Sequence, residues 1–366
     1  MQTTFSLAQL ADAEIKEAER ILRVCVHCGF CNATCPTYQL LGDELDGPRG
    51  RIYQIKDLLE GAKPASAKMV KHIDRCLSCL NCMTTCPSGV NYMHLVDHAR
   101  IHVEETYARP LGDRLLRALL ALVLPRPRLF RWALRAAGLV RPVRRWLPGR
   151  LGGLIDQAPR RLPPAPSLGH AGAFPAEGAR RKRVALLAGC AQQVLDPEIN
   201  AATVRVLNRH GCEVVIAAGA GCCGALAHHM GKTAPALTQV KANVAAWSRE
   251  IEGEGLDAIV INASGCGTTV KEYGFMLRDD PAWAPRAAAV AERACDLSEL
   301  LDDLDLAAGG APAPLTVGYH SACSLQHGQK IHALPRRLLE TAGFVVRDIP
   351  EGHLCCGSAG TYNLLQ

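Results

Sequence analysis

Two matching cysteine runs in the first quarter of the chain constrain its fold more than any other feature. Each run has the form Cys-x-x-Cys-x-x-Cys-x-x-x-Cys-Pro, and together they comprise Cys25, Cys28, Cys31, Cys35, Cys76, Cys79, Cys82 and Cys86. Three thiolates spaced three residues apart can wrap one cluster from a tight loop, whereas the fourth cysteine, fixed by its proline, points towards a second cluster. The spacing therefore predicts two [4Fe–4S] clusters, one held by Cys25, Cys28, Cys31 and Cys86 and one held by Cys76, Cys79, Cys82 and Cys35.

Structural zinc is the competing interpretation of these cysteines. Zinc sites need four ligands, which two separated Cys-x-x-Cys pairs commonly supply. Eight cysteines in two four-cysteine runs, each followed by proline, fit the cluster pattern better. His27 lies inside the first run, but the ligand set is complete without it, so we expect it beside the metal rather than bound to it.

The number of cysteines also argues for metal chemistry. The chain has 17 cysteines in 366 residues, and an odd count in a chain of this length does not suggest a disulfide framework. Residues 1–24 are amphipathic and charged, which is not the pattern of a signal peptide. We therefore expect a cytoplasmic location, where clustered cysteines are more often metal ligands than disulfides.

The net charge of +6 arises from one segment. Eleven arginines lie between Arg109 and Arg150, against Asp113 as the single acid, and they alternate with leucine, valine and tryptophan. Helices on a membrane interface have this pattern, and a peripheral contact would form on the inner face of the cytoplasmic membrane. A solvated face and a partner-docking arm fit equally well. Residues 115–124, the longest apolar stretch, are broken by Arg117 and too short to span a bilayer.

Composition and periodicity divide the chain into four segments and predict an α+β protein. Residues 1–110 are expected to form a helical, two-cluster ferredoxin-like domain. Residues 111–182, which prolines interrupt, are expected to form a basic connector followed by a flexible linker. Residues 183–309 and 310–366 are expected to form two α/β Cys-Cys-Gly domains. In the first domain, helices are expected over residues 7–24, 51–60 and 91–105.

An internal repeat defines the two α/β domains. Cys190 precedes Cys222-Cys223-Gly224 by 32 positions, and Cys323 precedes Cys355-Cys356-Gly357 by the same 32. In each copy a strand is followed by a helix that ends at glycine, a second strand and the Cys-Cys-Gly sequence. The shared offset and element order indicate a duplication. The first copy is expected to contain strands over residues 184–188, 214–218 and 258–262, and helices over residues 197–210 and 234–252.

The first repeat supplies four more candidate ligands, namely Cys190, Cys222, Cys223 and Cys266. Each follows a predicted strand, and the carboxyl ends of parallel strands converge on one crevice. Gly224 would permit the sharp turn that lets two adjacent cysteines bind one metal. The leading prediction is a third iron–sulfur cluster, with zinc or a free thiol pair as alternatives. Cys323, Cys355 and Cys356 form a weaker candidate metal site in the second repeat.

The second repeat is expected to be incomplete. Cys266 follows Cys223 by 43 positions, so its counterpart would lie at about position 399 by the logic of duplication, whereas the chain ends at Gln366. We therefore expect the strand over residues 344–347 to lack a neighbour. A piece of a longer protein is the favoured explanation, and a partner subunit that covers the gap is the alternative.

We expect no flavin, NAD or nucleic acid on this chain. Residues 219–224 satisfy Gly-x-Gly-x-x-Gly after a strand, but a dinucleotide site also needs an acid about 20 residues later, where Val240, Lys241 and Asn243 stand. The glycine spacing before Lys232 is two residues too long for a phosphate loop. Aromatic residues are only 5% of the chain, fewer than proteins that stack nucleic-acid bases usually have.

Two ferredoxin runs followed by two Cys-Cys-Gly repeats resemble a known family. It includes the glycolate oxidase iron–sulfur subunit, lactate-utilisation iron–sulfur proteins, the anaerobic glycerol-3-phosphate dehydrogenase small subunit and heterodisulfide reductase subunits. The resemblance to the glycolate oxidase iron–sulfur subunits is close. The likeness rests on VHCGFC at residues 26–31, TCPTYQLLGDELDGPRGR at residues 34–51, ASGCG at residues 263–267 and HLCCGSAGTY at residues 353–362.

The resemblance implies a subunit of a membrane-associated glycolate dehydrogenase. Partner subunits would oxidise the hydroxyacid at FAD, and this chain would relay electrons singly towards quinone, so no catalytic residue is expected here. The equivalent subunit of a lactate or glycerol-3-phosphate dehydrogenase and a non-redox zinc-binding scaffold are the alternatives. The wider family often has cysteine where Ala263 stands, so the five-cysteine chemistry of heterodisulfide reductase is not expected.

Overall fold

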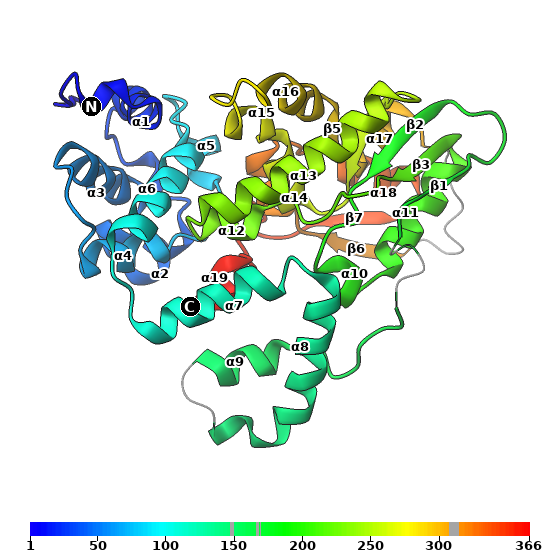
Figure 1. Ribbon diagram of the computed structural model, residues 1–366, viewed down its shortest axis with the longest axis horizontal. Coiled ribbons are helices and arrows are strands. Elements are labelled where there is room, and N and C mark those ends of the chain that lie inside the picture. Colours follow the sequence, from blue (N-terminus) through cyan, green and yellow to red (C-terminus); the bar gives the residue numbers. More distant parts are fainter. Residues whose placement is uncertain (147–149, 166–167, 169, 307–314) are drawn as a thin grey trace.

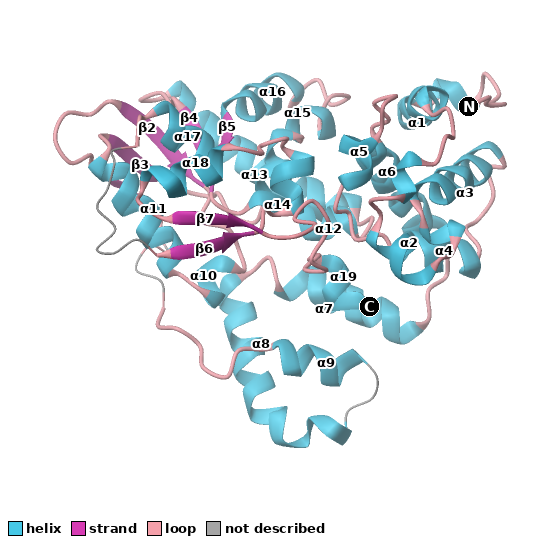
Figure 2. Cartoon of the chain, turned by 180° about the vertical axis from the view of Figure 1, so that it is seen from behind, coloured by secondary structure: helices cyan, strands magenta, loops and turns pink. Residues whose placement is uncertain are grey.

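The computed structural model describes residues 1–146, 150–165, 168, 170–306 and 315–366. A helical N-terminal domain lies at one end of the molecule, and the α/β repeats lie at the other (Figure 1). A helical arm projects from between them, and the view from behind shows that the strands are confined to the α/β end (Figure 2). This arrangement confirms the predicted α+β class.

The N-terminal domain is a bundle of short helices. Asp12 begins the first long helix by accepting hydrogen bonds from the backbone N–H groups of Glu14 and Ile15. Pro36 and Pro48 each occupy the first turn of a helix, where their missing N–H costs nothing. The helices are α1 (Ala13–Val24), α2 (Pro36–Leu41), α3 (Pro48–Glu60), α4 (Ala67–Asp74), α5 (Asn81–Thr85) and α6 (Tyr92–Thr106).

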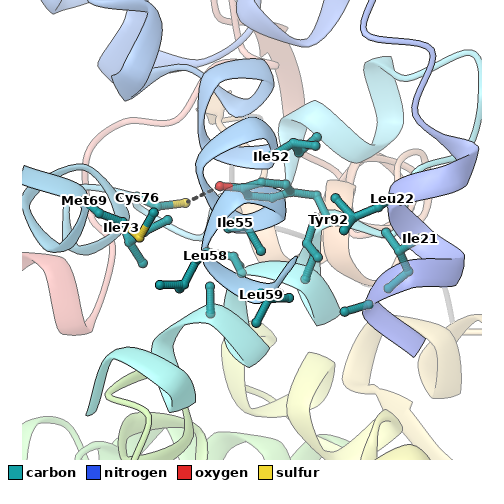
Figure 3. Close-up of a cluster of buried hydrophobic side chains, with 14 of the residues drawn as sticks. Ile21, Leu22, Ile52, Ile55, Leu58, Leu59, Met69, Ile73, Cys76 and Tyr92 are labelled. Atoms are coloured by element: carbon teal, nitrogen blue, oxygen red, sulfur yellow. Dashed lines mark hydrogen bonds between the residues drawn. The ribbon is translucent and has the colours of Figure 1, made fainter. Parts of the chain in front are cut away.

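One apolar core holds this bundle together. The inward faces of α1, α3 and α6 contribute Leu22, Ile55 and Leu95, each fully buried. Figure 3 shows the cluster, with Tyr92 reaching across it towards Cys76. The helices expected over residues 51–60 and 91–105 are confirmed. The first helix was expected from residue 7 but begins at Ala13, after the 3₁₀ turn η1 (Gln9–Ala11).

Residues 111–146 and 150–157, called the basic arm below, are more regular than the sequence suggested. They form α7 (Leu111–Val123), α8 (Pro127–Val140), the 3₁₀ segment η4 (Arg141–Trp146) and α9 (Arg150–Gln157). Pro127 begins α8 rather than interrupting it, because the first turn of a helix needs no N–H donor. Within the part of the chain that the structure describes, no helix combines the length and the apolar character needed to cross a membrane.

The basic arm is anchored at its start. Arg109 and Arg117 are buried and pair with Asp74 of the N-terminal domain, at N–O distances of 2.6 and 3.0 Å. On the other side, Leu120 packs with Met230 and Leu365 of the α/β repeats. Because α7 touches both ends of the molecule, the start of this segment is a structural bridge rather than a free connector.

The segment expected to be a linker contains the edge strand β1 (Gly172–Phe174), which pairs antiparallel with β3 (Cys212–Ile216). The sequence did not reveal this strand, because three residues are too few to display an alternating pattern. The predicted boundary between residues 309 and 310 lies outside the described residues.

The first repeat is a parallel sheet covered on both faces. The strand order is β1-β3-β2-β4-β5, and all neighbours except β1 run parallel. Val184 and Leu186 of β2 face α11 and α17, whereas Ala185 faces α13 and α16. The three predicted strands and two predicted helices are confirmed. The elements are β2 (Lys182–Leu186), α10 (Gln192–Leu195), α11 (Glu198–Arg209), β3 (Cys212–Ile216), α12 (Ala225–His229), α13 (Thr233–Glu252), β4 (Ala258–Ile261), α14 (Ser264–Lys271), α15 (Tyr273–Met276), α16 (Ala284–Arg293), β5 (Ala294–Asp296) and α17 (Leu297–Asp303).

The second repeat has the same element order as the first. Its elements are β6 (Thr316–Tyr319), the short π-helix η5 (Ser324–Gly328), α18 (Leu334–Thr341), β7 (Val345–Asp348) and α19 (Thr361–Leu365). The expectation that the last strand lacks a neighbour was wrong, because β7 pairs in parallel with β6, as β3 pairs with β2. The pair is a separate two-stranded sheet, and Val345 is 41% exposed on it.

Candidate metal centres

The first ferredoxin pocket, called pocket 1, is lined by Cys25, Cys28, Cys31 and Cys86. Three of these come from the loop between α1 and α2, where Gly29 adopts a left-handed φ of +91° that turns the chain. Cys86 arrives from the end of α5. Burial raises the pKa of Cys31 to about 11, and the neighbouring Cys25, Cys86 and Cys28 add to the shift. Pocket 1 thus gathers the first predicted set of four thiols.

The second ferredoxin pocket, called pocket 2, is lined by Cys35, Cys76, Cys79 and Cys82. Cys35 precedes α2, and the other three come from the loop and helix after α4. Cys82, Pro48 and Tyr92 line both pockets, so the two sites share a wall. The exchange of the fourth cysteine between the runs matches the predicted sets. Ligation itself stays a prediction.

The first-repeat thiols, Cys190, Cys222, Cys223 and Cys266, meet at the carboxyl ends of β2, β3 and β4. The Sγ atoms of Cys223 and Cys266 are 3.1 Å apart. Cys190 contacts Cys222, and Cys222 contacts Cys223. Contact with Cys190 lowers the pKa of Cys222, but contact with Cys223 and burial outweigh it and raise the pKa to about 12. A bound cation would relieve this crowding of four ionisable sulfurs.

Backbone geometry and two buried side chains hold the Cys-Cys-Gly loop in place. Gly224 has φ of +90°, and a Cβ there would lie 3.2 Å from the carbonyl oxygen of Ala236. Asn243 accepts from the N–H of Gly221 at 2.7 Å and donates to the oxygen of Cys222 at 2.9 Å. Tyr273 donates to the oxygen of Cys223 at 2.8 Å. Sequence reasoning missed the roles of both side chains, because neither lies near the cysteines in the chain.

The second-repeat thiols, Cys323, Cys355 and Cys356, lie against pocket 2. Cys355 is in hydrogen-bonding contact with Cys323 and with Cys79 of pocket 2. These two contacts lower the pKa of the Cys355 thiol. Gly357 repeats the left-handed turn of Gly224, with φ of +86°. The contact with Cys79 was not predicted, because no local pattern records a contact between distant parts of a chain.

Polar contacts join the second repeat to both neighbouring sites. Asn81 of α5 donates to the oxygen of His353 at 2.8 Å, and Thr84 Oγ1 lies 2.7 Å from His327 Nδ1. On the other side, Ser324 donates to Ser264 at 2.7 Å, two residues before Cys266. The His327 side chain and the His353 backbone thus help to join the second repeat to the N-terminal domain.

The other two cysteines are accounted for by packing. Cys212 is fully buried on β3 and Cys295 packs against the same core, as expected for small apolar side chains.

The donor sets fit iron–sulfur clusters. Each ferredoxin pocket offers its predicted four thiols, with the shared Cys82 also at pocket 1, and no carboxylate is among the described residues that line either pocket. Soft sulfur donors of this kind select iron–sulfur clusters or zinc over hard cations. His27 lines pocket 1, as expected for a neighbour of the cluster, and its Nε2 has no hydrogen-bond partner among the described residues.

Family models match most of the segments that carry these thiols. The 4Fe-4S dicluster domain matches residues 21–90, which include both ferredoxin runs. The Cysteine-rich domain family matches residues 184–271 and 317–366, which include the two repeats. No solved structure matches the chain.

Two curated relatives match over the whole chain, and a third matches half of it. The glycolate oxidase iron–sulfur subunit of Escherichia coli (strain K12) is 47% identical over 364 residues, which cover all of this chain and 86% of that relative. The probable glycolate oxidase iron–sulfur subunit of Bacillus subtilis (strain 168) is 32% identical over 384 residues, covering all of this chain and 85% of that protein. Lactate utilization protein A of Bacillus cereus (strain B4264) is 30% identical over 184 residues, which are 50% of this chain and 74% of that relative. The chain therefore belongs to the family of glycolate oxidase iron–sulfur subunits.

Proposed function

We propose that this chain is the electron-transfer subunit of a glycolate oxidase. Pocket 1 and pocket 2 each hold a [4Fe–4S] cluster, and the first-repeat thiols hold a third iron–sulfur cluster. A bound cluster supplies reversible one-electron transfer. Partner subunits that carry FAD oxidise the hydroxyacid, and quinone accepts the electrons at the end of the relay. Because a flavin releases two electrons and a cluster accepts one, a series of one-electron sites suits this division of labour.

The observation that carries the proposal is the unbroken succession of thiol sites. Cys82 lines both ferredoxin pockets, and Cys79 of pocket 2 contacts Cys355. Ser324, next to Cys323, is hydrogen-bonded to Ser264 beside the first-repeat thiols. These contacts connect each site to the next, which supports a relay through the chain.

The exposure of two thiols supports two places at which the chain exchanges electrons with its partners. Most of the ferredoxin cysteines are buried or half-buried, whereas Cys28 of pocket 1 is exposed. Cys356 of the second repeat is also exposed. The burial of most thiols limits the access of water to the sites. The two exposed thiols lie at the protein surface, where electrons enter or leave the chain.

We assign glycolate rather than lactate as the substrate of the complex because of how much of this chain each group of relatives matches. The two relatives whose names include glycolate oxidase match all of this chain. The relatives named for lactate utilization match only half of it, at 29–30% identity.

The basic arm supports peripheral attachment to a membrane. It carries eleven of the large apolar side chains that are exposed among the described residues, and Trp132 and Trp146 are 65% and 87% exposed. Exposed Arg128, Arg135 and Arg145 lie among them. Exposed apolar side chains and arginines on neighbouring helices suit the boundary between lipid headgroups and acyl chains. The apolar residues are Leu111, Leu115, Leu119, Leu122, Leu129, Trp132, Leu139, Val140, Val143, Trp146 and Leu151.

Cys28→Ser and Cys79→Ser test the relay in the assembled complex. Each variant is expected to abolish glycolate-dependent reduction of a quinone analogue, because each removes a ligand from one ferredoxin pocket. Reduction of the partner flavin by glycolate should survive, since the hydroxyacid never touches this chain. Cys212→Ser, a buried cysteine outside the thiol sites, is the matched control and should retain quinone reduction. Unchanged quinone reduction in both pocket variants would contradict the relay.

A further inference from the structure

Two arginines at the start of α3 lie at different ferredoxin pockets. Arg49 lines pocket 1 and Arg51 lines pocket 2. Pro48, which begins α3, lines both pockets, so this helix begins at their shared wall. One cationic side chain therefore lies beside each pocket, and the two can be compared for burial and for charge pairing.

Arg51 is buried and held in a fixed orientation. Its side chain is 1% exposed. Nε donates to the backbone oxygen of His72 at 2.8 Å, and Nη2 donates to Thr37 Oγ1 at 3.1 Å. These bonds leave Nη1 directed at pocket 2, 3.9 Å from the Sγ atom of Cys35.

The acid beside Arg51 does not cancel its charge. Asp46 is fully buried and lies 3.4 Å from Arg51 Nη2, but it also pairs with Arg75 at 2.9 Å and lies 2.9 Å from His72 Nδ1. One carboxylate is thus shared by two guanidinium groups, which leaves a net positive charge next to pocket 2.

Arg49, unlike Arg51, is partly exposed and its charge is balanced by one acid. Its side chain is 34% exposed and forms a one-to-one pair with Glu44, with an N–O distance of 2.6 Å. A neutral pair near water contributes little at a neighbouring site, because solvent screens it and the two charges offset each other.

We propose that Arg51 raises the reduction potential at pocket 2 above that at pocket 1, which directs electrons from pocket 1 inwards. The inference rests on the proposed function. Reduction adds one electron and no proton, so the site gains one negative charge. A buried cation stabilises that charge strongly, because a low dielectric screens it little. Burial alone would oppose reduction, but the net positive charge and the hydroxyl of Tyr92, which donates to Cys76 Sγ at 3.8 Å (Figure 3), offset it.

A redox titration of the full chain, followed by electron paramagnetic resonance and poised with dithionite as reductant, tests the assignment. Cys35→Ser identifies the pocket 2 signal as the one it alters, and that signal should have the higher midpoint potential of the two ferredoxin sites. Arg51→Gln should lower this midpoint potential and leave the pocket 1 signal in place. Arg51→Lys, which keeps the charge, should retain most of the wild-type value, and Arg49→Gln should leave the pocket 2 potential unchanged.

Two results would overturn the inference while the proposed function stands: equal potentials at the two sites in the wild type, or an unshifted pocket 2 signal in a cluster-loaded Arg51→Gln protein. If Arg51→Gln does not fold, Asp46→Asn provides the opposite change. It removes the shared acid and should raise the pocket 2 potential, and an unchanged or lower value would contradict the assignment. Absence of any iron–sulfur signal from the wild-type chain would refute the proposed function and this inference together.

Discussion

Asp97 joins the N-terminal domain to the first repeat. It is buried on α6, with His228 and His229 of α12 within 3.3 and 3.2 Å and Arg100 within 3.4 Å. Arg100 in turn donates to the backbone oxygen of Cys76 at 2.8 Å and to Ser78 at 2.7 Å. A single carboxylate therefore links the loop of pocket 2 to the helix that follows Cys222 and Cys223.

This link predicts a pH-dependent stability. Burial lowers the pKa of His228, but Asp97 outweighs it and the net pKa is raised above the ordinary value of 6.5, with Arg100 opposing and Glu272 assisting. The contribution of His228 to stability is therefore complete below about pH 6.5 and is lost as the pH rises through the raised pKa. Asp97, whose pKa is lowered well below its usual value, stays charged throughout this range. The thermal unfolding midpoint of the wild type should fall between pH 6 and pH 8 more than that of His228→Gln.

Asp97→Ala is the companion variant. Its thermal unfolding midpoint should no longer show the additional fall between pH 6 and pH 8 that the wild type shows. Its free energy of unfolding should be lower by about 3–5 kcal/mol, because the buried cations are left without their partner. Parallel pH profiles for the wild type and His228→Gln would show that the histidine carries no charge in this link.

The basic arm is the element whose surface is least explained by the fold. α7 buries Arg117 and Leu120 but exposes Leu111, Leu115 and Leu119, and no residue of α8 is buried. Exposed apolar surface of this extent is typical of an interaction site rather than of a solvated face. Its arginines favour an anionic surface as the partner.

The arm predicts selective binding to anionic vesicles. In flotation, the chain should rise with vesicles that contain anionic lipid and stay behind with neutral ones, because both apolar insertion and charge attraction are needed. Replacing Arg128, Arg135 and Arg145 by Gln should abolish this flotation, whereas Arg205→Gln with Arg209→Gln, on the first repeat, should not. If both sets of variants still float with anionic vesicles, the assignment is contradicted. If the wild-type chain does not float at all but still binds its partners, the arm is a docking arm for a partner.

At the scale of the whole molecule, the thiol sites follow one another from the N-terminal domain into the repeats. The spacing of the cysteines predicted which thiols line pocket 1 and pocket 2, including the exchange of Cys35 and Cys86, because each run directs its fourth cysteine towards the other run. Their binding of clusters stays a prediction. The position of Cys190, Cys222, Cys223 and Cys266 after predicted strands indicated that they converge at the sheet edge, because parallel strands end on the same side.

Other features could not be predicted from local patterns. The contact of Cys79 with Cys355 and the link from Asp97 to His228 join residues far apart in the chain, and such pairs have no periodic signal. The burial of Arg51 was hidden because charged residues near the start of a helix are usually exposed. The pairing of β7 with β6, by contrast, follows from the duplication, because β6 and β7 correspond to β2 and β3, which pair in the same way.

The central claim is that this chain carries iron–sulfur clusters, and the content of iron and acid-labile sulfide per chain tests it most directly. Protein purified without oxygen should be brown, with broad absorbance near about 400 nm and about eight irons from the two ferredoxin pockets, rising to about twelve when the first-repeat thiols are also loaded. Sulfide should match iron in amount, and Cys28→Ser should lower both, whereas Cys212→Ser should lower neither. A colourless protein that contains zinc and no sulfide would contradict the account.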